Sequence, residues 1–284
     1  MSYIIETALE LACVYSFVAL ALFLSFRILD IADLTTDGCF VLGMCVSIVC
    51  TLNNHPLLGI VLGMVSGGLA GLVTALLQTK LGVPSILAGI ITNTALYTIN
   101  LMVMGFSSNI SILRNKTIFN GNKLLLLVLI VVVAMILLRY FLSTRLGLSI
   151  RATGDNIDMV SASSINPKAC ILIGLIISNM LTGLGGALAG QLQKSADINA
   201  GNGIVTIGLA TLIIGETLIN GKKSISRNII ACLIGNIIYR LIYAFILQTH
   251  IIPIECLKLM TALIITLAIA LPYLRIERRL YVED

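Results

Sequence analysis

The stretch DLTTDGCFVLG, from Asp33 to Gly43, opens an unusually short apolar segment. The apolar run 38–52 has about 15 residues, whereas a helix that crosses a bilayer needs about 20. A second stretch, DINAGNGIVTIG from Asp197 to Gly208, opens another short apolar run, 204–219. Both stretches begin with an acid, turn at a glycine and carry the spacing G-x-x-x-x-G into the apolar run. The sequence therefore predicts two short or broken membrane segments of matching design.

The two short segments lie about five spans apart in the predicted order, so we expect them to run in opposite directions. Inverted repeats with short, glycine-interrupted segments at matching positions are typical of transporters whose solute path runs between the halves. Broken segments persist at membrane depth only where protein or a water-filled cavity satisfies the backbone. A chance likeness between two glycine-rich turns is the alternative.

The composition of the whole chain is that of a polytopic membrane protein. Of 284 residues, 58% are hydrophobic and 11% are charged, there is no tryptophan, and the mean hydropathy is +1.05. We expect an all-α membrane helix bundle of about eight or nine spans, forming one transmembrane domain over residues 1–284. The candidate segments are 6–26, 38–52, 57–78, 83–104, 123–142, 169–190, 204–219, 228–248 and 255–274.

Lysine and arginine residues beside these segments predict the orientation, since cytoplasmic loops retain them. They place the amino terminus outside and the carboxyl terminus in the cytoplasm. The net charge of +5 is thus explained by topology and the lipid bilayer, and no nucleic acid partner is expected. The residues on the predicted cytoplasmic side are Arg27, Lys80, Arg139, Arg145, Arg151, Lys168, Lys222, Lys223, Arg227, Arg275, Arg278 and Arg279. Four others fall outside, against this pattern: Arg114, Lys116, Lys123 and Lys194.

Glycines repeat along one face of the third segment, in GIVLGMVSGGLAGL. Gly59, Gly63, Gly67 and Gly71 are spaced four residues apart, which lets another helix approach closely. We expect a helix-packing face here, although the pattern alone does not distinguish an internal contact from a subunit contact.

Polar residues form stripes on the fourth and sixth segments. In GIITNTALYTINLMVMG, Asn93, Tyr97 and Asn100 fall at i, i+4 and i+7, and Asn179 begins a comparable stripe on the sixth segment. An unpaired amide in hydrocarbon costs several kcal/mol, so these faces must meet polar groups or water. Hydrogen bonds between helices are one explanation. The other, which we adopt, is that these four residues line a translocation path.

Motifs for catalysis, metal binding and nucleotide binding are missing, so we expect a transport subunit without enzyme activity, cofactor or metal. The seven cysteines are scattered, with no C-x-x-C spacing. GETLINGKKS fails as a phosphate loop, because five residues separate Gly215 from Gly221 and Lys223 replaces serine or threonine. Any ATP must be bound by another chain. Glu216 is the best candidate for an intramembrane acid, near the cytoplasmic end where water or Lys222 could reach it.

One polar loop, RATGDNIDMVSASSINPKA from Arg151 to Ala169, interrupts the apolar sequence. Asp155 or Asn156 can cap a short helix, which Asn166-Pro167 then ends. Ile157, Val160 and Ala162 give this helix a partly apolar face. Such a cytoplasmic helix suits docking into a groove on a soluble partner, and an ordinary solvated loop is the alternative.

The loop, with the later LTGLGGALAG and IGLATLIIGETLINGKKS and the early ILDIADLTTDGCFVLG, resembles the permease subunits of bacterial ABC importers of the branched-chain amino acid and ribose type. The resemblance covers nearly the whole chain. It implies a bacterial cell-membrane importer with two permease subunits, here favoured as a homodimer. It also implies two cytoplasmic ATP-binding subunits and an extracellular or periplasmic solute-binding protein.

The resemblance further implies a coupling helix around 155–165 that receives the ATPases, and uptake of an amino acid or a similar small polar metabolite. The coupling residues would be Arg151, Gly154, Asp155, Asn156, Ile157, Met159 and Val160. Three residues depart from the family pattern by replacing glycines: Ser164, Glu216 and Lys223. Two other functions remain open, an ion-coupled carrier or channel that works without an ATPase and a structural subunit without a path.

Overall fold

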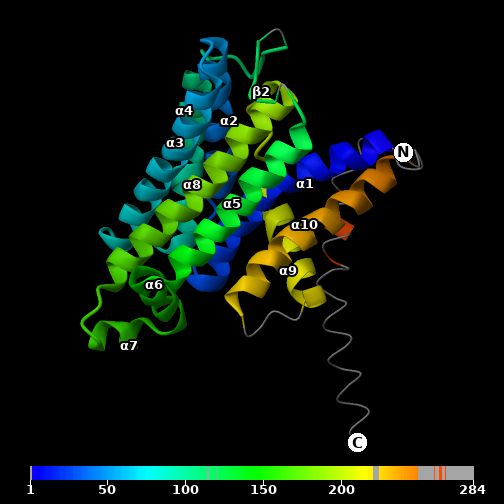
Figure 1. The fold of residues 1–284 in the computed structure, drawn as a ribbon. Helices are drawn as coiled ribbons and strands as arrows, with labels where there is room; N and C mark the ends of the chain where they lie inside the picture. Colours follow the sequence, from blue (N-terminus) through cyan, green and yellow to red (C-terminus); the bar gives the residue numbers. More distant parts are fainter. Residues whose placement is uncertain are drawn as a thin grey trace, which may run out of the picture.

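The computed structural model describes residues 2–113, 115–119, 121–219 and 224–248, and four isolated positions, 259, 262, 263 and 266. In these residues the chain forms a bundle of helices with one short two-stranded ribbon at one end (Figure 1). The helices are α1 (Ser2–Leu22) with a π-helical continuation η1 (Phe23–Ile28), α2 (Thr36–Leu52), α3 (Pro56–Thr79), α4 (Ser85–Val103), α5 (Lys123–Ser143), α6 (Arg145–Asp155), α7 (Ile157–Ala162), α8 (Pro167–Gln193), α9 (Ile204–Ile219) and α10 (Ile225–Gln248).

The all-α, polytopic class expected from the sequence is confirmed. Six helices in the described part of the chain are long and apolar enough to cross a membrane, namely α1 with η1, α3, α4, α5, α8 and α10. The two short apolar segments are α2 and α9, with 17 and 16 residues. The ninth candidate segment, 255–274, lies almost entirely outside the described residues.

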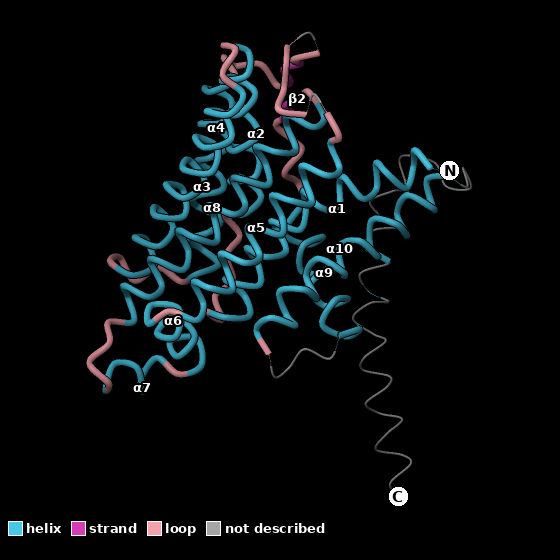
Figure 2. Tube along the Cα trace, in the orientation of Figure 1, coloured by secondary structure: helices cyan, strands magenta, loops and turns pink. Residues whose placement is uncertain are grey.

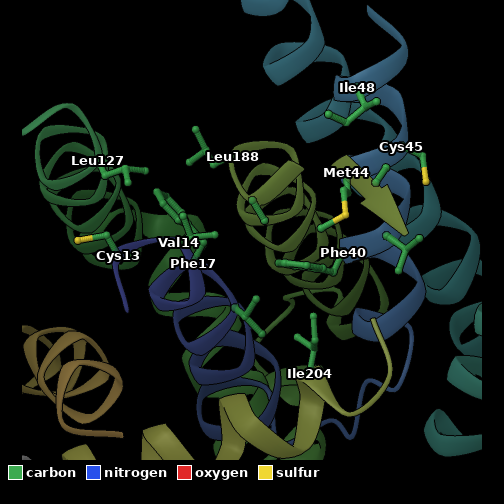
Figure 3. Packing of buried hydrophobic residues seen from close by; sticks show 14 of the residues in the cluster. Cys13, Val14, Phe17, Phe40, Met44, Cys45, Ile48, Leu127, Leu188 and Ile204 are labelled. Atoms are coloured by element: carbon green, nitrogen blue, oxygen red, sulfur yellow. The ribbon is translucent and has the colours of Figure 1, made fainter. Parts of the chain in front are cut away.

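Helix α8 is the common partner of α1, α2 and α3, which all pack against it; the path of the chain through the bundle is traced in Figure 2. Figure 3 shows Val14 and Phe17 of α1, Phe40 and Met44 of α2, and Leu188 of α8 in this core. Helices that are apolar on all sides suit such an environment. By contrast α5 buries the smallest share of its residues among the long helices, because most of its side chains face outward from the bundle.

The glycine face of α3 is buried against α8 and α2, so the predicted packing face is an internal contact. A Cβ at Gly63 would lie 2.8 Å from the Cβ of Ala187, and one at Gly67 would lie 3.0 Å from the Cα of Gly183. Gly71 meets α8 in the same way, while Gly59 faces the carbonyl oxygen of Ser47 in α2. These distances leave no room for side chains, so the backbones themselves are in contact.

The ribbon joins two loops that are far apart in the sequence. Strand β1 (Asn109–Ser111) pairs antiparallel with β2 (Ser195–Asp197), with Asn109 opposite Asp197. It lies at the end of the bundle opposite α6 and α7 (Figure 1). The sequence indicated only loops here, because three-residue strands leave no readable alternation.

Replacing Gly67 by valine should destabilise the protein by about 1–3 kcal/mol, because the added atoms force α3 away from α8. The apparent melting temperature of detergent-purified protein would report the change. Gly121→Val is the matched control, since Gly121 is exposed and a Cβ added there would have no described atom within 4 Å. A native melting temperature for Gly67→Val would contradict this close packing.

Candidate functional site

The two short helices begin side by side and share one carboxylate. Asp37, in the first turn of α2, accepts hydrogen bonds from the backbone N–H of Val205 at 2.9 Å and of Gly203 at 3.3 Å. These are donors at the start of α9 that no helical turn satisfies. A Cβ at Gly201 would collide with the backbone of Asp37, which shows how closely the segments meet. Because both helix N-termini carry partial positive charge, one carboxylate stabilises both.

A second acid, Asp33, lies four residues earlier and is fully buried. Its Oδ1 accepts a hydrogen bond from Thr35 N at 2.9 Å, and its Oδ2 accepts one from Asn179 Nδ2 at 2.6 Å. Asn179 is near the midpoint of α8. The hydroxyls of Thr35 and Thr74 lie 2.8 Å apart and join the same region to α3. The extended chain before α2 is therefore held by polar contacts to two neighbouring helices.

The asparagines of α4 approach the same turn from another side. Asn100 donates from Nδ2 to the carbonyl oxygen of Gly38 at 3.2 Å. A Cβ at Gly38 would lie 2.5 Å from Oδ1 of Asn93, so a larger residue there would displace the Asn93 side chain. Oδ1 of Asn100 and Oδ1 of Asn179 are buried without a hydrogen-bond partner among the described residues. Buried polar atoms normally have one, so these two oxygens are unsatisfied acceptors beside the start of α2.

Three of the four residues expected to line a path thus gather around the start of α2, namely Asn93, Asn100 and Asn179. Tyr97 does not join them, because it lies on the outer face of α4 with 52% of its surface exposed. Asp33 and Asp37 were not predicted as site residues, since the sequence marks the first only as the acidic start of a turn. Their spacing of four residues ahead of an apolar run was the available signal.

Charged groups inside the bundle are also more numerous than the sequence indicated. Glu10 of α1 and Arg240 of α10 are buried, with relative exposures of 9% and 8%. Glu216, expected to be the main intramembrane acid, instead forms a two-pronged ion pair with Arg27, whose Nε lies 2.9 Å from Oε1. Lys222, its expected partner, lies outside the described residues.

The polar loop forms two helices where the sequence predicted one. The first, α6, is begun by Thr144, whose hydroxyl accepts from Gly147 N at 3.3 Å. Arg151 is half-buried on α6, and Gly154 lies so close to the carbonyl oxygen of Ile28 that no side chain fits. Asp155, the alternative predicted cap, is the exposed last residue of α6.

The second helix, α7, is capped by Asn156, whose Oδ1 accepts from Met159 N at 3.0 Å. Val160 is buried at 2%, whereas Ile157 and Met159 are exposed at 52% and 67%. Asn166 then caps α8 through Lys168 N at 3.0 Å. Ser164, which replaces the glycine of the resembling family, has a φ of 60°, the left-handed conformation that glycine adopts most easily.

Comparison with known proteins assigns the chain to a family. Residues 4–269 match the family described as "Branched-chain amino acid transport system / permease component". The chain belongs to this permease family. It is 33% identical over 280 residues to a tyrosine transport system permease protein of Clostridioides difficile (strain R20291), covering 98% of this chain and 94% of that one.

Two further relatives match the chain. An uncharacterized protein of Rickettsia prowazekii (strain Madrid E) is 32% identical over 275 residues, covering 94% of this chain and 97% of the relative. The D-allose transport system permease protein AlsC of Escherichia coli (strain K12) is 36% identical over 104 residues, covering 36% of this chain and 31% of the relative. No solved structure gives a significant match. The family resemblance noted in the sequence is confirmed.

Removing the carboxylate of Asp37 should destabilise the protein, because the start of α9 loses its acceptor. We expect Asp37→Ala to cost about 0.5–2 kcal/mol, as for other helix caps, and Asp37→Asn to cost less because it keeps an acceptor oxygen. Melting of the purified variants would measure this, with the exposed Glu6→Ala as control. Equal melting temperatures for Asp37→Ala and the native protein would contradict the capping role.

Asp33 and Asn179 should be energetically coupled through their 2.6 Å hydrogen bond. A double-mutant cycle of Asp33→Ala and Asn179→Ala is expected to give a coupling energy of about 1–3 kcal/mol, since the bond involves a buried charge-bearing group. Unfolding titrations in detergent would measure it. Ser178→Ala is the control partner, because Ser178 bonds to Ala21 of α1 instead and should be additive with Asp33→Ala.

Proposed function

We propose that the chain is the membrane-spanning subunit of an ATP-driven importer for a small solute, an amino acid or a similar polar metabolite. Membership of the permease family gives the transport role. Two observations support a drive by ATP from another chain. Helix α7 is capped and has exposed apolar side chains, and the sequence of the chain has no working nucleotide loop. Nucleotide chemistry must then come from a cytoplasmic ATP-binding subunit.

Contact with that subunit is assigned to α7 and the end of α6. Ile157 and Met159 project outward, while Val160 anchors the helix to the bundle. Exposed apolar side chains on a helix are the usual means of docking into a groove. Movement of α7 reaches the bundle directly, because Gly154 lies against η1 and Asn166 caps α8. Arg151, Gly154, Asp155 and Asn156 complete this coupling region.

The solute path is assigned to the region where α2 and α9 begin. Asp33 and Asp197 each form the same local turn, accepting from the backbone N–H two residues later at 2.9 and 2.7 Å. Both turns precede short helices, which supports an inverted repeat of two halves. Asn93, Asn100 and Asn179 would offer polar contacts along the path. Tyr97 stands on an exposed face of α4, away from this region, and is not part of the proposed lining.

The solute class follows the relatives rather than the site. One relative is named for tyrosine transport and another, over a shorter stretch, for D-allose transport. The greater coverage of the first favours an amino acid. A solute-binding protein outside the membrane would supply most of the selectivity, and the β1–β2 ribbon lies at the end of the bundle where it would dock.

An ion-coupled carrier that works alone is the second candidate, and one observation favours it. Asp33 is a fully buried acid, and its hydrogen-bond partners are neutral groups. Buried intramembrane acids often carry protons or ions. Its position at the N-terminus of α2 gives it a structural explanation as well, so the test must separate the two mechanisms.

Replacing Met159 or Ile157 by aspartate should abolish ATP-driven uptake while leaving the fold intact. A charge in the centre of a docking interface weakens it by about tenfold or more. Uptake of radiolabelled amino acids would be measured in proteoliposomes with the ATP-binding subunit and binding protein expected in neighbouring reading frames. Met159→Leu, which keeps an exposed apolar side chain at the same position, is the control.

The outcomes separate the candidates. Normal uptake by Met159→Asp would overturn the coupling role of α7. Solute flux driven by an ion gradient, in liposomes that contain this chain without an ATPase, would instead establish the carrier. The Asp33→Asn variant should lose such flux if the carrier is correct.

A further inference from the structure

A cavity of about 370 Å³ lies between α1 and α10, apart from the region where α2 and α9 begin. The two helices run side by side toward the amino terminus (Figure 1). Ala8 and Leu11 of α1 and Tyr243, Ala244 and Leu247 of α10 form largely apolar walls. Its size falls within the range of small-molecule sites, about 300–1,000 Å³.

The wall of this cavity also contains the guanidinium-bearing side chain of Arg240. Arg240 is 8% exposed and sits in the interior of α10, a helix long enough to cross the membrane. Its guanidinium carbon lies 3.7 Å from the ring centroid of Tyr15, a cation–π contact. Nε of Arg240 has no hydrogen-bond partner in the described part of the chain. Among the described residues, no carboxylate forms an ion pair with Arg240, because the ion pair found there joins Arg27 to Glu216.

Neighbouring side chains on α10 are equally unsatisfied. Asn236 and Tyr239, one turn before and one residue before Arg240, are each 1% exposed. Both amide atoms of Asn236 and the hydroxyl of Tyr239 lack partners within the residues that the structure describes. A buried cation without a counter-charge is costly, and buried polar atoms without partners add to the cost. Of these three residues Arg240 lines the cavity, and its unbalanced charge there points to a ligand that supplies the missing negative charge.

We propose that this cavity binds a carboxylate attached to a compact apolar body, with the carboxylate at Arg240. One guanidinium balances one negative charge, which fits a carboxylate better than a doubly charged phosphate monoester. The apolar walls would hold an aromatic or short aliphatic group. This chemistry has two sources, an aromatic amino acid that is transported or a fatty acid from the membrane.

A chain of side-chain contacts joins this cavity to the region where α2 begins. The Tyr15 ring that contacts Arg240 also packs against Phe40, with ring centroids 5.6 Å apart. Phe40 follows Asp37 by three residues in α2. A ligand that draws the guanidinium away from Tyr15 therefore alters a contact within the first two turns of α2.

The test is a binding measurement on the purified chain in phosphatidylcholine nanodiscs, by isothermal titration. The probes are L-tyrosine, 3-(4-hydroxyphenyl)propionate, tyramine and decanoate. We expect the carboxylates to bind and tyramine, which lacks a carboxylate, to fail. Arg240→Gln should weaken carboxylate binding by about ten- to hundredfold, the usual effect of losing a charged hydrogen bond.

A second variant guards against misfolding of Arg240→Gln. Ala244→Phe keeps the arginine and fills the cavity, and should lose binding to the same degree. Ile242→Phe adds an aromatic ring to the exposed face of the same helix and should bind like the native protein. Melting temperatures of all three establish that each variant is folded.

Each result decides the matter. Binding of tyrosine or hydroxyphenylpropionate with this variant pattern supports a solute site, and binding of decanoate alone with the same pattern supports a lipid-derived carboxylate. Absence of carboxylate binding, or unchanged binding in Arg240→Gln and Ala244→Phe, overturns the proposal. The assay contains no ATPase and measures no transport, so its failure leaves the proposed importer role standing, and the reverse also holds.

Discussion

One constraint governs the structure: the unpaired backbone N–H groups at a helix start inside an apolar bundle must find hydrogen-bond acceptors. The chain entering α2 bonds to Asn179 near the midpoint of α8, and α9 begins beside it, so water at the bundle ends does not satisfy their first N–H groups. Asp37 accepts a hydrogen bond from Val205 N at the start of α9, and Asp33 accepts one from Thr35 N just before α2. Each carboxylate therefore stabilises the helix start beside it.

Close helix packing around that point follows from glycine. Gly183 of α8 lies against Gly63 and Gly67 of α3, and Gly43 of α2 lies against Gly183. With the backbones in contact, the short polar side chains of Asp33 and Asn179 can reach one another. Larger residues at these positions would separate the helices and leave the same polar groups unpaired, so packing and polar satisfaction are parts of one design.

Periodic and local features were predictable from the sequence, and features that depend on contacts between distant segments were not. The run 204–219 coincides with α9, and Asn156 was one of two foreseen caps, because hydropathy and capping are local. Asp33 is hydrogen-bonded to Asn179, 146 positions away, and Glu216 is paired with Arg27 from another distant segment. Tyr97 shared a helical stripe with Asn93 and Asn100 yet faces outward, since a stripe spans more than one side of a helix.

The left-handed backbone at Ser164 limits the flexibility of the connection between α7 and α8. Glycine at a joint of this kind adopts the conformation freely and lets the joint flex, whereas a side chain narrows the accessible backbone states. The connection between α7 and α8 is therefore restricted at Ser164, and the Asn166 cap fixes its end where α8 begins. If α7 receives an ATP-binding subunit as proposed, this restricted joint would pass a displacement of α7 on to the axis of α8 with less loss than a glycine joint would.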